Sequence, residues 1–498
     1  MSSSEPSVLL PTEIWHRISS LLSKSDVINL SESSTYFLCM IRPLFYRKIN
    51  LFQNHQVITT LSLLGRDKEL AGVVSELSLR ANQPIAKQRR CLINLNAMKN
   101  MTGMKTLTLL GDILWNSDGD ETTQLFEILH EMRDLKEFNV DLAWKPDDIP
   151  LSENQLGKIQ KLEVIRWTCH GPRSEILLHS LLSGSLDSLH TLHISLSTFD
   201  ETTQALLFSL RFPRLESLTL RDVSEGDPLG EPFIRFIIGH DTLTHLDLNY
   251  LMGRTSSLRF NDDILDAFKA NPSTILPRLK SFRGDATSVG VMARAGLSCL
   301  STSLVKLELG PSGNGHSEIE MLREVLGICG LDDITQLGHS RGRFGVLKDF
   351  GLQLKDFSGS GVSMFVFTYL ASFISAAASV SDDPFPKSPI EVWRLPFPYV
   401  NCPADVRTPE EVAHTFRVLR NLKVLHLDWR FVGEEDFESE VWMEQFVKKC
   451  GEKVERVYFC RYPDGDVVES WGIERGRMEE NGPVKSKPKI WLEFQNHD

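Results

Sequence analysis

The sequence lacks the patterns that support most catalytic and metal-binding chemistry. Its eight cysteines form no CxxC pair and no Cys/His set with zinc-ligand spacing, and no HExxH motif occurs. The glycine-rich run at 310–315 follows neither the dinucleotide-binding pattern nor the phosphate-binding loop. No paired carboxylates stand out among the 66 acidic residues. We therefore expect no catalytic residue, no metal and no cofactor.

The sequence also lacks an excess of positive charge. Its formal net charge is −12, which argues against a nucleic-acid-binding surface. Short basic runs at 87–90 and 485–489 are typical of solvated loops, with nuclear-targeting signals as the alternative. The first residues contain no basic segment followed by an apolar core. We therefore expect reduced thiols and a cytoplasmic or nuclear location, or both.

One long stretch lacks charge altogether. No charged residue occurs between positions 357 and 381, a length that can cross a bilayer. Within it Thr368, Ser372, Ser375 and Ser379 recur at helical spacing and would share one face. A stripe of small polar side chains favours a helix that packs against neighbouring structure. We therefore expect no membrane partner.

The organising feature of the sequence is a repeated motif, apolar-x-x-apolar-x-apolar. It begins at Val74, Met104, Leu135, Leu162, Leu189, Leu215, Leu243, Leu304, Leu347, Ile390, Leu422 and Val454. A run from Leu279 fits only in its first two apolar positions. Between Leu135 and Leu243 the motifs begin 27, 27, 26 and 28 residues apart, which is similar to leucine-rich repeats.

Each repeat is expected to supply one short strand and one returning helix. Helical patterns of suitable length occupy 121–132, 173–184 and 201–212. The residues between the apolar positions are polar, so one face of the sheet must meet solvent. An ordinary α/β protein, whose parallel strands are buried on both faces, fits this pattern less well. We predict an α/β fold with a leucine-rich-repeat solenoid over residues 51–460.

The repeats depart from a regular leucine-rich pattern. The position eight residues beyond the first apolar residue is asparagine only at Asn82, so we expect an irregular solenoid. Longer intervals predict insertions near 250–278, 310–346 and 355–389. Residues 461–498, with KIWLEF as a candidate strand, are predicted to form a C-terminal cap.

A different pattern precedes the repeats. We expect one helix to start at Pro11, a second to be capped by Ser25 and Asp26, and a third to end at Pro43. The first helix and its end carry a single apolar stripe, formed by Ile14, Ile18, Leu21 and Leu22.

This order of helices resembles the F-box. The matching residues are Leu10-Pro11, Glu13-Ile14, Ile18, Leu21-Leu22, Asp26-Val27 and Leu30, followed by Leu38, Ile41, Leu44 and Tyr46. The resemblance covers residues 7–50, and the family commonly joins an F-box to leucine-rich repeats. The segment LFYRKI replaces a tryptophan that is usual late in the motif, a form similar to fungal-type F-box proteins.

The resemblance implies a partner and a role. F-box proteins bind a Skp-type adaptor, which links them to a cullin, so the resemblance implies a substrate-recognition subunit of an SCF ubiquitin ligase. The implied adaptor-binding residues are Leu10, Pro11, Ile14, Leu22, Val27 and Leu30. The alternative is a leucine-rich-repeat scaffold without a ubiquitin role, whose first helices only cap the first repeat.

A protein substrate is expected to bind the outward-facing positions of the strands. The candidate residues are Arg166, His193, Arg221, Asp247, Asn249, Arg283, Glu308, Arg394, His426 and Asp428. Their mixed charge suits selection of a protein or peptide.

One enzyme alternative is a hydrolase. The segment GHSRG at 338–342 fits the G-x-S-x-G nucleophile elbow, with Ser340 as the nucleophile. The preceding segment makes a poor core strand and no HGGG-type loop occurs, so we favour a non-catalytic protein.

Overall fold

The computed structural model describes most of the first two thirds of the chain and separate strands beyond. The described residues are 12–19, 21–81, 94–111, 119–142, 159–169, 174–196, 200–222, 229–250, 260, 262–310, 344, 346–352, 390–395, 421–428, 445, 454–461, 469–474 and 489–493. They belong to two compact units, Met1–Ile194 (unit 1) and Ser195–Asp498 (unit 2). The division falls within strand β6 (Thr191–Leu196).

Unit 1 begins with three helices. They are α1 (Thr12–Ser19), α2 (Lys24–Ser33) and α3 (Thr35–Arg47). The cap of α2 is Ser23 and not the predicted Ser25-Asp26, because the Ser23 side chain accepts a hydrogen bond from the Asp26 N–H. The predicted end of the third helix at Pro43 was also wrong. Leu44 and Phe45 beyond it pack against Val27, and this burial offsets the hydrogen bond that a proline removes.

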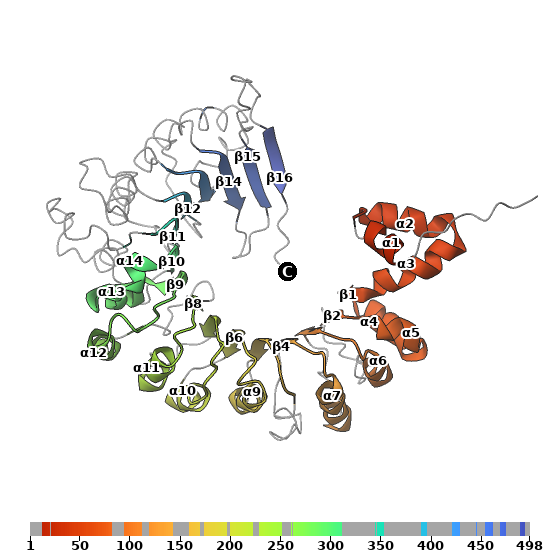
Figure 1. The fold of residues 1–498 in the computed structure, drawn as a ribbon, viewed down its shortest axis with the longest axis horizontal. Helices are drawn as coiled ribbons and strands as arrows, with labels where there is room; N and C mark the ends of the chain where they lie inside the picture. The colour runs from red at the N-terminus through yellow and green to blue at the C-terminus, as the bar shows by residue number, and fades with distance from the viewer. Residues whose placement is uncertain are drawn as a thin grey trace, which may run out of the picture. The chain divides into compact units, whose positions relative to one another are not determined.

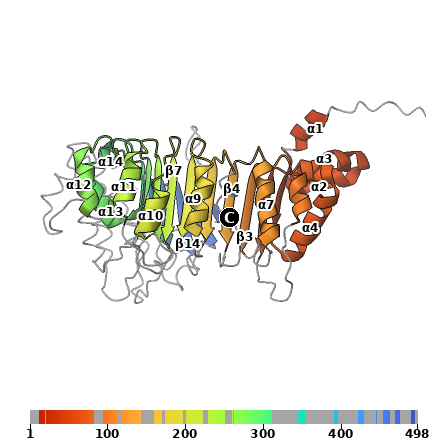
Figure 2. The ribbon, with the colours of Figure 1, turned by 90° about the horizontal axis from the view of Figure 1, so that it is seen from below.

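The rest of unit 1 alternates strands and helices. The strands are β1 (Lys48–Leu51), β2 (Glu76–Ala81), β3 (Thr106–Gly111), β4 (Glu137–Leu142) and β5 (Val164–Cys169), paired in parallel in that order. The helices are α4 (Asn54–Arg66), α5 (Lys68–Gly72), α6 (Leu95–Asn100), α7 (Gly119–Glu131) and α9 (Ser174–Ser183). Figure 1 shows these helices on one face of the strands, and Figure 2 shows α7 and α9 against that face. The opposite face is the sheet face of unit 1.

Unit 2 has the same alternation. Parallel pairing joins β7 (Ser217–Asp222), β8 (His245–Tyr250), β9 (Ser281–Asp285), β10 (Lys306–Gly310), β11 (Asp349–Leu352), β12 (Val392–Leu395), β13 (Val424–Asp428) and β14 (Arg456–Arg461). Its described helices are α10 (Glu201–Leu207), α11 (Glu231–Ile238), α12 (Asp262–Ala270), α13 (Ala286–Arg294) and α14 (Cys299–Thr302). Two antiparallel strands, β15 (Glu469–Glu474) and β16 (Lys489–Glu493), follow β14. Both units are therefore α/β structures built on parallel strands, as a repeat protein requires.

The repeated motif marks the strands closely. From β2 to β14, each strand begins two residues after the first apolar residue of its motif. In the first of these motifs, Val74, Leu77 and Leu79 are at most 1% exposed. The polar residues between them point to the other face, because side chains alternate along a strand. The spacing thus produces one buried face and one solvent-facing sheet face.

The imperfect motif at Leu279 has a steric explanation. A methyl group on Gly284, the third apolar position, would lie 2.8 Å from Cζ of Phe282. Carbon atoms do not approach so closely without displacement. The Phe282 ring therefore fills the space that a third apolar side chain fills in other repeats, and glycine is required beside it.

Neighbouring repeats are joined by a regular backbone seam. In unit 1 the Lys105 carbonyl accepts hydrogen bonds from the N–H groups of Lys136 and Glu137, at 2.8 and 3.0 Å. In unit 2 the Glu216 carbonyl accepts from Thr244 and His245, at 2.8 and 3.0 Å. The acceptor is the second residue of the motif in each case. The seam therefore uses main-chain atoms alone.

Side chains also reach across repeats. Ser188 Oγ donates to the Leu162 carbonyl at 2.8 Å in unit 1, and His240 Nε2 accepts from the Phe212 N–H at 2.9 Å in unit 2. Further pairs of this kind are Asn100 with Leu64, Gln204 with Gly230, and Ser288 with Phe260. These varied bonds satisfy buried backbone groups within both units.

Several sequence expectations lie outside the described residues. They are the 357–381 stretch, the 338–342 motif, the basic run at 87–90, the run at 485–489 apart from Lys489, and Asn82 with its equivalent positions. Of the predicted insertions, the first contains α12, the second is almost wholly outside and the third is wholly outside. The predicted strand in KIWLEF is confirmed as β16, whereas β15 was not predicted. Where the chain is described, no helix combines the length and apolar character needed to cross a membrane.

Candidate partner-binding surfaces

The N-terminal helices expose large apolar side chains. Ile14 is 44% exposed on α1, Leu21 and Leu22 are 82% and 38% exposed in the following turn, and Ile28 is 40% exposed on α2. We call these four residues the N-terminal apolar surface. Backbone bonds from the N–H groups of Leu21 and Leu22 to the end of α1 fix the turn. The helices thus hold these side chains in contact with solvent.

A small core lies beneath this surface. Val27 is 8% exposed, and its neighbours are Trp15, Leu30, Phe37, Leu44 and Phe45. The rings of Trp15 and Phe37 meet edge to face, with centroids 4.8 Å apart. Val27 and Leu30 therefore pack inside the helical group, although both were expected at the adaptor surface. The helical phase explains this, because Ile28 points away from its neighbour Val27.

Of the other predicted adaptor residues, Ile14 and Leu22 are exposed, while Leu10 and Pro11 lie outside the described residues. The prediction omitted the exposed Leu21 and Ile28. The sequence contained a pattern for each of them. Leu21 belongs to the apolar stripe of the first helix, and Ile28 is adjacent to the apolar residue Val27.

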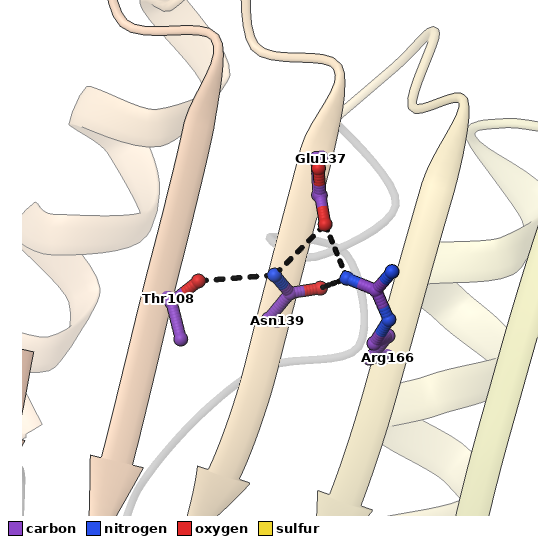
Figure 3. A network of polar contacts seen from close by, with 4 residues as sticks. All are labelled: Thr108, Glu137, Asn139 and Arg166. Carbon is purple, nitrogen blue, oxygen red and sulfur yellow. Dashed lines mark hydrogen bonds and ion pairs between the residues drawn. The ribbon is translucent and has the colours of Figure 1, made fainter. Parts of the chain in front are cut away.

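The sheet face of unit 1 carries a connected polar network. Arg166 Nη1 pairs with Glu137 and donates to Asn139 Oδ1 at 3.1 Å. Asn139 Nδ2 donates to Thr108 Oγ1 and to Glu137 Oε1, both at 3.0 Å (Figure 3). The network spans β3, β4 and β5. The Asn139 amide bonds to the carboxylate and to the guanidinium, which also pair directly with each other (Figure 3).

The sheet face of unit 2 carries a row of alternating charge, formed by Arg221, Asp247, Arg283 and Glu308, which we call the charged row. These residues lie on β7, β8, β9 and β10, and all were predicted from the sequence. Arg283 Nε lies 3.1 Å from Glu308 Oε1, but Arg283 Nη1 lies 3.9 Å from Asp247 Oδ2. The second distance is too long for a hydrogen bond. Glu308 therefore holds Arg283, and Asp247 is paired only weakly.

Burial shifts the pKa of two residues in the charged row. Burial raises the pKa of Asp247 to about 6, against the opposing attraction of Arg283 and Arg221. Burial likewise lowers the pKa of Arg221. Asp247 Oδ1 and Arg221 Nε are buried and lack a hydrogen-bond partner. Perturbed titration together with unpaired polar atoms is typical of functional sites.

The remaining predicted residues are spread along the sheet faces. His193 on β6 and His426 on β13 are partly buried, and both have contacts within the structure. Asn249, Arg394 and Asp428 lie on strands β8, β12 and β13, and their side chains are outside the described part of the structure. In register, Arg394 lies opposite His426 on the neighbouring strand.

The sequence interpretation missed a set of ion pairs at the strand starts. Glu391 lies between two lysines, 3.3 Å from Lys348 Nζ and 2.8 Å from Lys423 Nζ. The hydrogen bond from Lys423 is the main reason that the pKa of Glu391 is lowered. Lys136 and Glu163 form a similar pair in unit 1. The sequence did contain a signal for these ion pairs, because the second residues of neighbouring motifs have opposite charges.

Within the described part of the chain, no three His, Cys, Asp or Glu side chains are grouped to hold a metal ion. Cys299 is buried, and burial raises the pKa of its thiol to about 12. It is therefore a poor nucleophile at neutral pH.

Comparisons with known proteins add little to these surfaces. No family model matches the sequence, and no curated protein matches it. Among solved structures, the chain is similar to a chain of the crystal structure of the Rad7 and Elc1 complex in yeast. The identity is 14%, the TM-score is 0.39, and the alignment covers 88% of this chain and 97% of the other. A likeness of this degree assigns neither a family nor a partner.

Proposed function

We propose that this protein is the substrate-recognition subunit of a cullin-type (SCF) ubiquitin ligase. Its N-terminal helices bind a Skp-type adaptor, and its sheet face binds a target protein. The observation that carries the proposal is the exposure of Ile14, Leu21, Leu22 and Ile28 on helices that resemble an F-box in sequence.

The exposed apolar residues are surplus to the core of these helices. Trp15, Val27 and Phe37 already form a packed interior. Leu21 at 82% exposed contributes almost nothing to it. Leaving several large aliphatic side chains in water is unfavourable, and such groups usually mark an interface. A partner with an apolar groove would bury them.

The sheet face supplies the second half of the proposal. The sheet face of each unit presents polar and charged side chains held by neighbouring strands, in the network of Arg166 in unit 1 and in the charged row of unit 2. Such a surface selects a partner by matching its charges and hydrogen bonds. A ligase receptor then acts by proximity, because holding the target raises its local concentration near the transfer enzyme. The protein itself contributes no catalytic step.

The scaffold alternative has an observation in its favour. The last N-terminal helix, α3, is bonded to the residue before β2, because the Ser75 N–H donates to the Arg47 carbonyl at 2.9 Å. The strand that follows α3 directly is joined to β2 by the ion pair of Lys48 with Glu76 at 2.8 Å. Terminal repeats need such a cap. Under this alternative the helices cap unit 1, and no adaptor binds them.

The two functions differ in adaptor binding. We expect Ile14→Asp combined with Leu22→Asp to weaken binding of a purified Skp-type adaptor by about thirtyfold or more, because charges would enter an apolar interface. Affinity is measured by calorimetry with the full chain. Both side chains are substantially exposed, so helical content by circular dichroism should not change.

Ile58→Asp is the matched control. Ile58 is 48% exposed on α4, outside the N-terminal apolar surface, and its replacement should leave adaptor binding intact. Absence of adaptor binding by the wild-type chain, or equal loss in both variants, would support the scaffold instead. Ser340→Ala should leave any esterase activity of the preparation unchanged, since we propose no enzyme activity.

A further inference from the structure

Three polar side chains stand side by side at the starts of β8, β9 and β10, which are neighbouring strands of unit 2 (Figure 1). They are His245, Ser281 and Lys306, and we call them the strand-start trio. In register, Ser281 lies opposite His245 on one side and opposite Lys306 on the other. Each member lies two residues before a member of the charged row, so all three share the sheet face with that row.

Two members of the trio have donors that nothing in the described structure uses. The side chains of Ser281 and Lys306 are partly exposed. Within the part of the chain that the structure describes, the Ser281 hydroxyl makes no hydrogen bond and Lys306 makes no ion pair. Glu308, on the same strand as Lys306, is held by Arg283 at 3.1 Å. Asp349, opposite Lys306 on β11, has contacts of its own.

The third member, His245, has its tautomer fixed by Thr244. The Thr244 hydroxyl donates to the Glu216 carbonyl at 3.1 Å, because a carbonyl oxygen can only accept. The same hydroxyl oxygen lies 2.7 Å from His245 Nδ1, so Nδ1 carries a proton and donates it. On the exposed ring, Nε2 is therefore a lone pair in the neutral form and an N–H donor in the protonated form. Only the protonated ring contributes a third donor.

Lysines surround the trio with positive charge. Burial is the main reason that the pKa of His245 is lowered, and Lys280 and Lys306 lower it further, against the opposing effect of Glu216. Both ammonium groups are therefore close enough to act on the ring. An anion placed over Ser281 would meet a hydroxyl and two ammonium groups, and it would favour the protonated ring.

A cation is not suited to the same place. It would be repelled by Lys280 and Lys306 and would find only neutral acceptors in the trio. The carboxylates of Asp247 and Glu308 lie two residues farther along their strands, about 7 Å away at the rise of a strand. The starts of these strands thus favour negative charge, although the charged row beyond them contains both signs.

We infer that the strand-start trio binds the acidic group of a target peptide, either a side-chain carboxylate or a phosphoryl group. Strands lie about 4.8 Å apart, so the side chains of His245 and Lys306 reach over Ser281 from its two sides. The Ser281 hydroxyl and the Lys306 ammonium donate to the anionic oxygens. His245 takes a proton from solvent and donates from Nε2. The inference rests on the proposed function only in that the acidic group belongs to a protein target.

The test is fluorescence anisotropy of labelled peptides with the full-length chain at pH 6.0, with one central residue varied and random flanking positions. Glu should bind about tenfold more tightly than Gln if the ligand is a carboxylate. Phosphoserine should show the larger gain, relative to Ser, if the ligand is a phosphoryl group. The absence of a gain from either acidic residue would overturn the inference. So would a preference for Lys.

Lys306→Gln combined with Ser281→Ala separates the trio from the general charge of unit 2. This variant should lose at least about fivefold of the acidic preference. Its unfolding temperature should change little, since neither side chain makes a hydrogen bond or an ion pair within the described structure. Lys423→Gln is the matched control, because it removes the same charge from a strand start of unit 2 where Glu391 already pairs with the lysine. Equal loss in the two variants would contradict a specific site.

The pH dependence tests the role of His245. Affinity for the Glu peptide should rise about fivefold from pH 7.5 to 5.5, because only the protonated ring donates from Nε2. The charged groups that act on the ring are Glu216, Lys280 and Lys306. Asp247, on the same strand, has a pKa raised to about 6 by burial and titrates in the same range. His245→Gln should abolish most of the rise, and Asp247→Asn should retain most of it. The reverse result would reject the role of His245.

Failure of this inference is distinguishable from failure of the proposed function. The peptide assay contains no adaptor, and the adaptor assay contains no peptide. An acidic preference without adaptor binding rejects the ligase role alone. Adaptor binding without an acidic preference rejects the inference alone.

Discussion

The two polar clusters on the sheet faces start from similar residues and reach different states. In unit 1 the carboxylate of Glu137 and the guanidinium of Arg166 share the Asn139 amide, and each is hydrogen-bonded. In unit 2 Asp247 and Arg221 each keep a buried atom without a partner. Glu137 and Arg166 also pair directly with each other, whereas Asp247 Oδ1 and Arg221 Nε make no hydrogen bond. Charge pairing between strands is therefore not enough to satisfy a buried ionic row, because geometry decides which atoms meet.

The prediction with the largest expected effect tests whether the negative charge of Asp247 destabilises unit 2. Its folded-state pKa is raised from 3.8 to about 6, so the folded protein binds the proton more tightly than the unfolded chain. Stability should therefore fall as pH rises from about 4 to 6, by roughly 3 kcal/mol for this group. Asp247→Asn should remove that slope and stabilise unit 2 at pH 7.5. Hydrogen exchange of β7 to β9 measures it.

Four charged groups also act on the pKa of Asp247, namely Arg221, Arg283, Lys306 and Glu308. Glu137→Gln in unit 1 is the contrasting variant. It should destabilise its network rather than relieve it, since Glu137 is already paired with Arg166. If both substitutions shift stability in the same direction, the contrast between the clusters does not hold.

A second prediction concerns the bonds that join repeats. His240 Nδ1 lies 2.6 Å from the Phe236 carbonyl and its Nε2 accepts from the Phe212 N–H, so the ring must be neutral. Burial lowers its pKa, so stability present above about pH 6.5 should be lost as pH falls below that value. His240→Leu should cost about 2 kcal/mol at pH 7.5, because the Phe212 N–H loses its partner.

Ser185 supplies the comparison in unit 1, where its Oγ accepts from the Leu162 N–H at 3.2 Å and does not titrate. Exchange of the Leu162 amide should be less sensitive to mild acid than exchange of the Phe212 amide. Equal acid sensitivity at the two amides would show that His240 is not the cause.

The prediction with the smallest expected effect adds an amide to the polar cluster of unit 2. Thr219 lies opposite Asp247 in register and two residues before Arg221, so Thr219→Asn places an amide beside both. We expect about 1 kcal/mol of added stability from the new hydrogen bonds. Thr108→Asn in unit 1 should gain nothing comparable, since that network is complete.

Much of the fold was predictable because burial follows a simple spacing. The strands from β2 to β14 begin two residues into their motifs, and only alternating side chains can face a helical layer. No repeat motif was predicted at β1, although Tyr46, Ile49 and Leu51 have the same spacing, because residues 7–50 were assigned to the F-box resemblance.

The surfaces were predictable only in part. Alternation placed Asp247 and Arg283 on the sheet face, yet no spacing reveals that Arg283 pairs more closely with Glu308. Near the N-terminus the apolar stripe was visible, but the burial of Val27 and the partial burial of Leu30 depend on how α3 packs across α2. Which ion-pair or packing partner a side chain contacts depends on the tertiary structure, and a local sequence pattern does not determine it.

The backbone seam has a consequence for how such a chain changes over time. Its acceptor position holds lysine in one repeat, glutamate in another and valine in a third, at Lys105, Glu216 and Val305, without altering the pair of bonds. A main-chain joint of this kind imposes no side-chain requirement at its acceptor position. Modules can therefore be duplicated, deleted or exchanged while each keeps its own outward residues, and new recognition surfaces can arise by recombination as well as by point substitution.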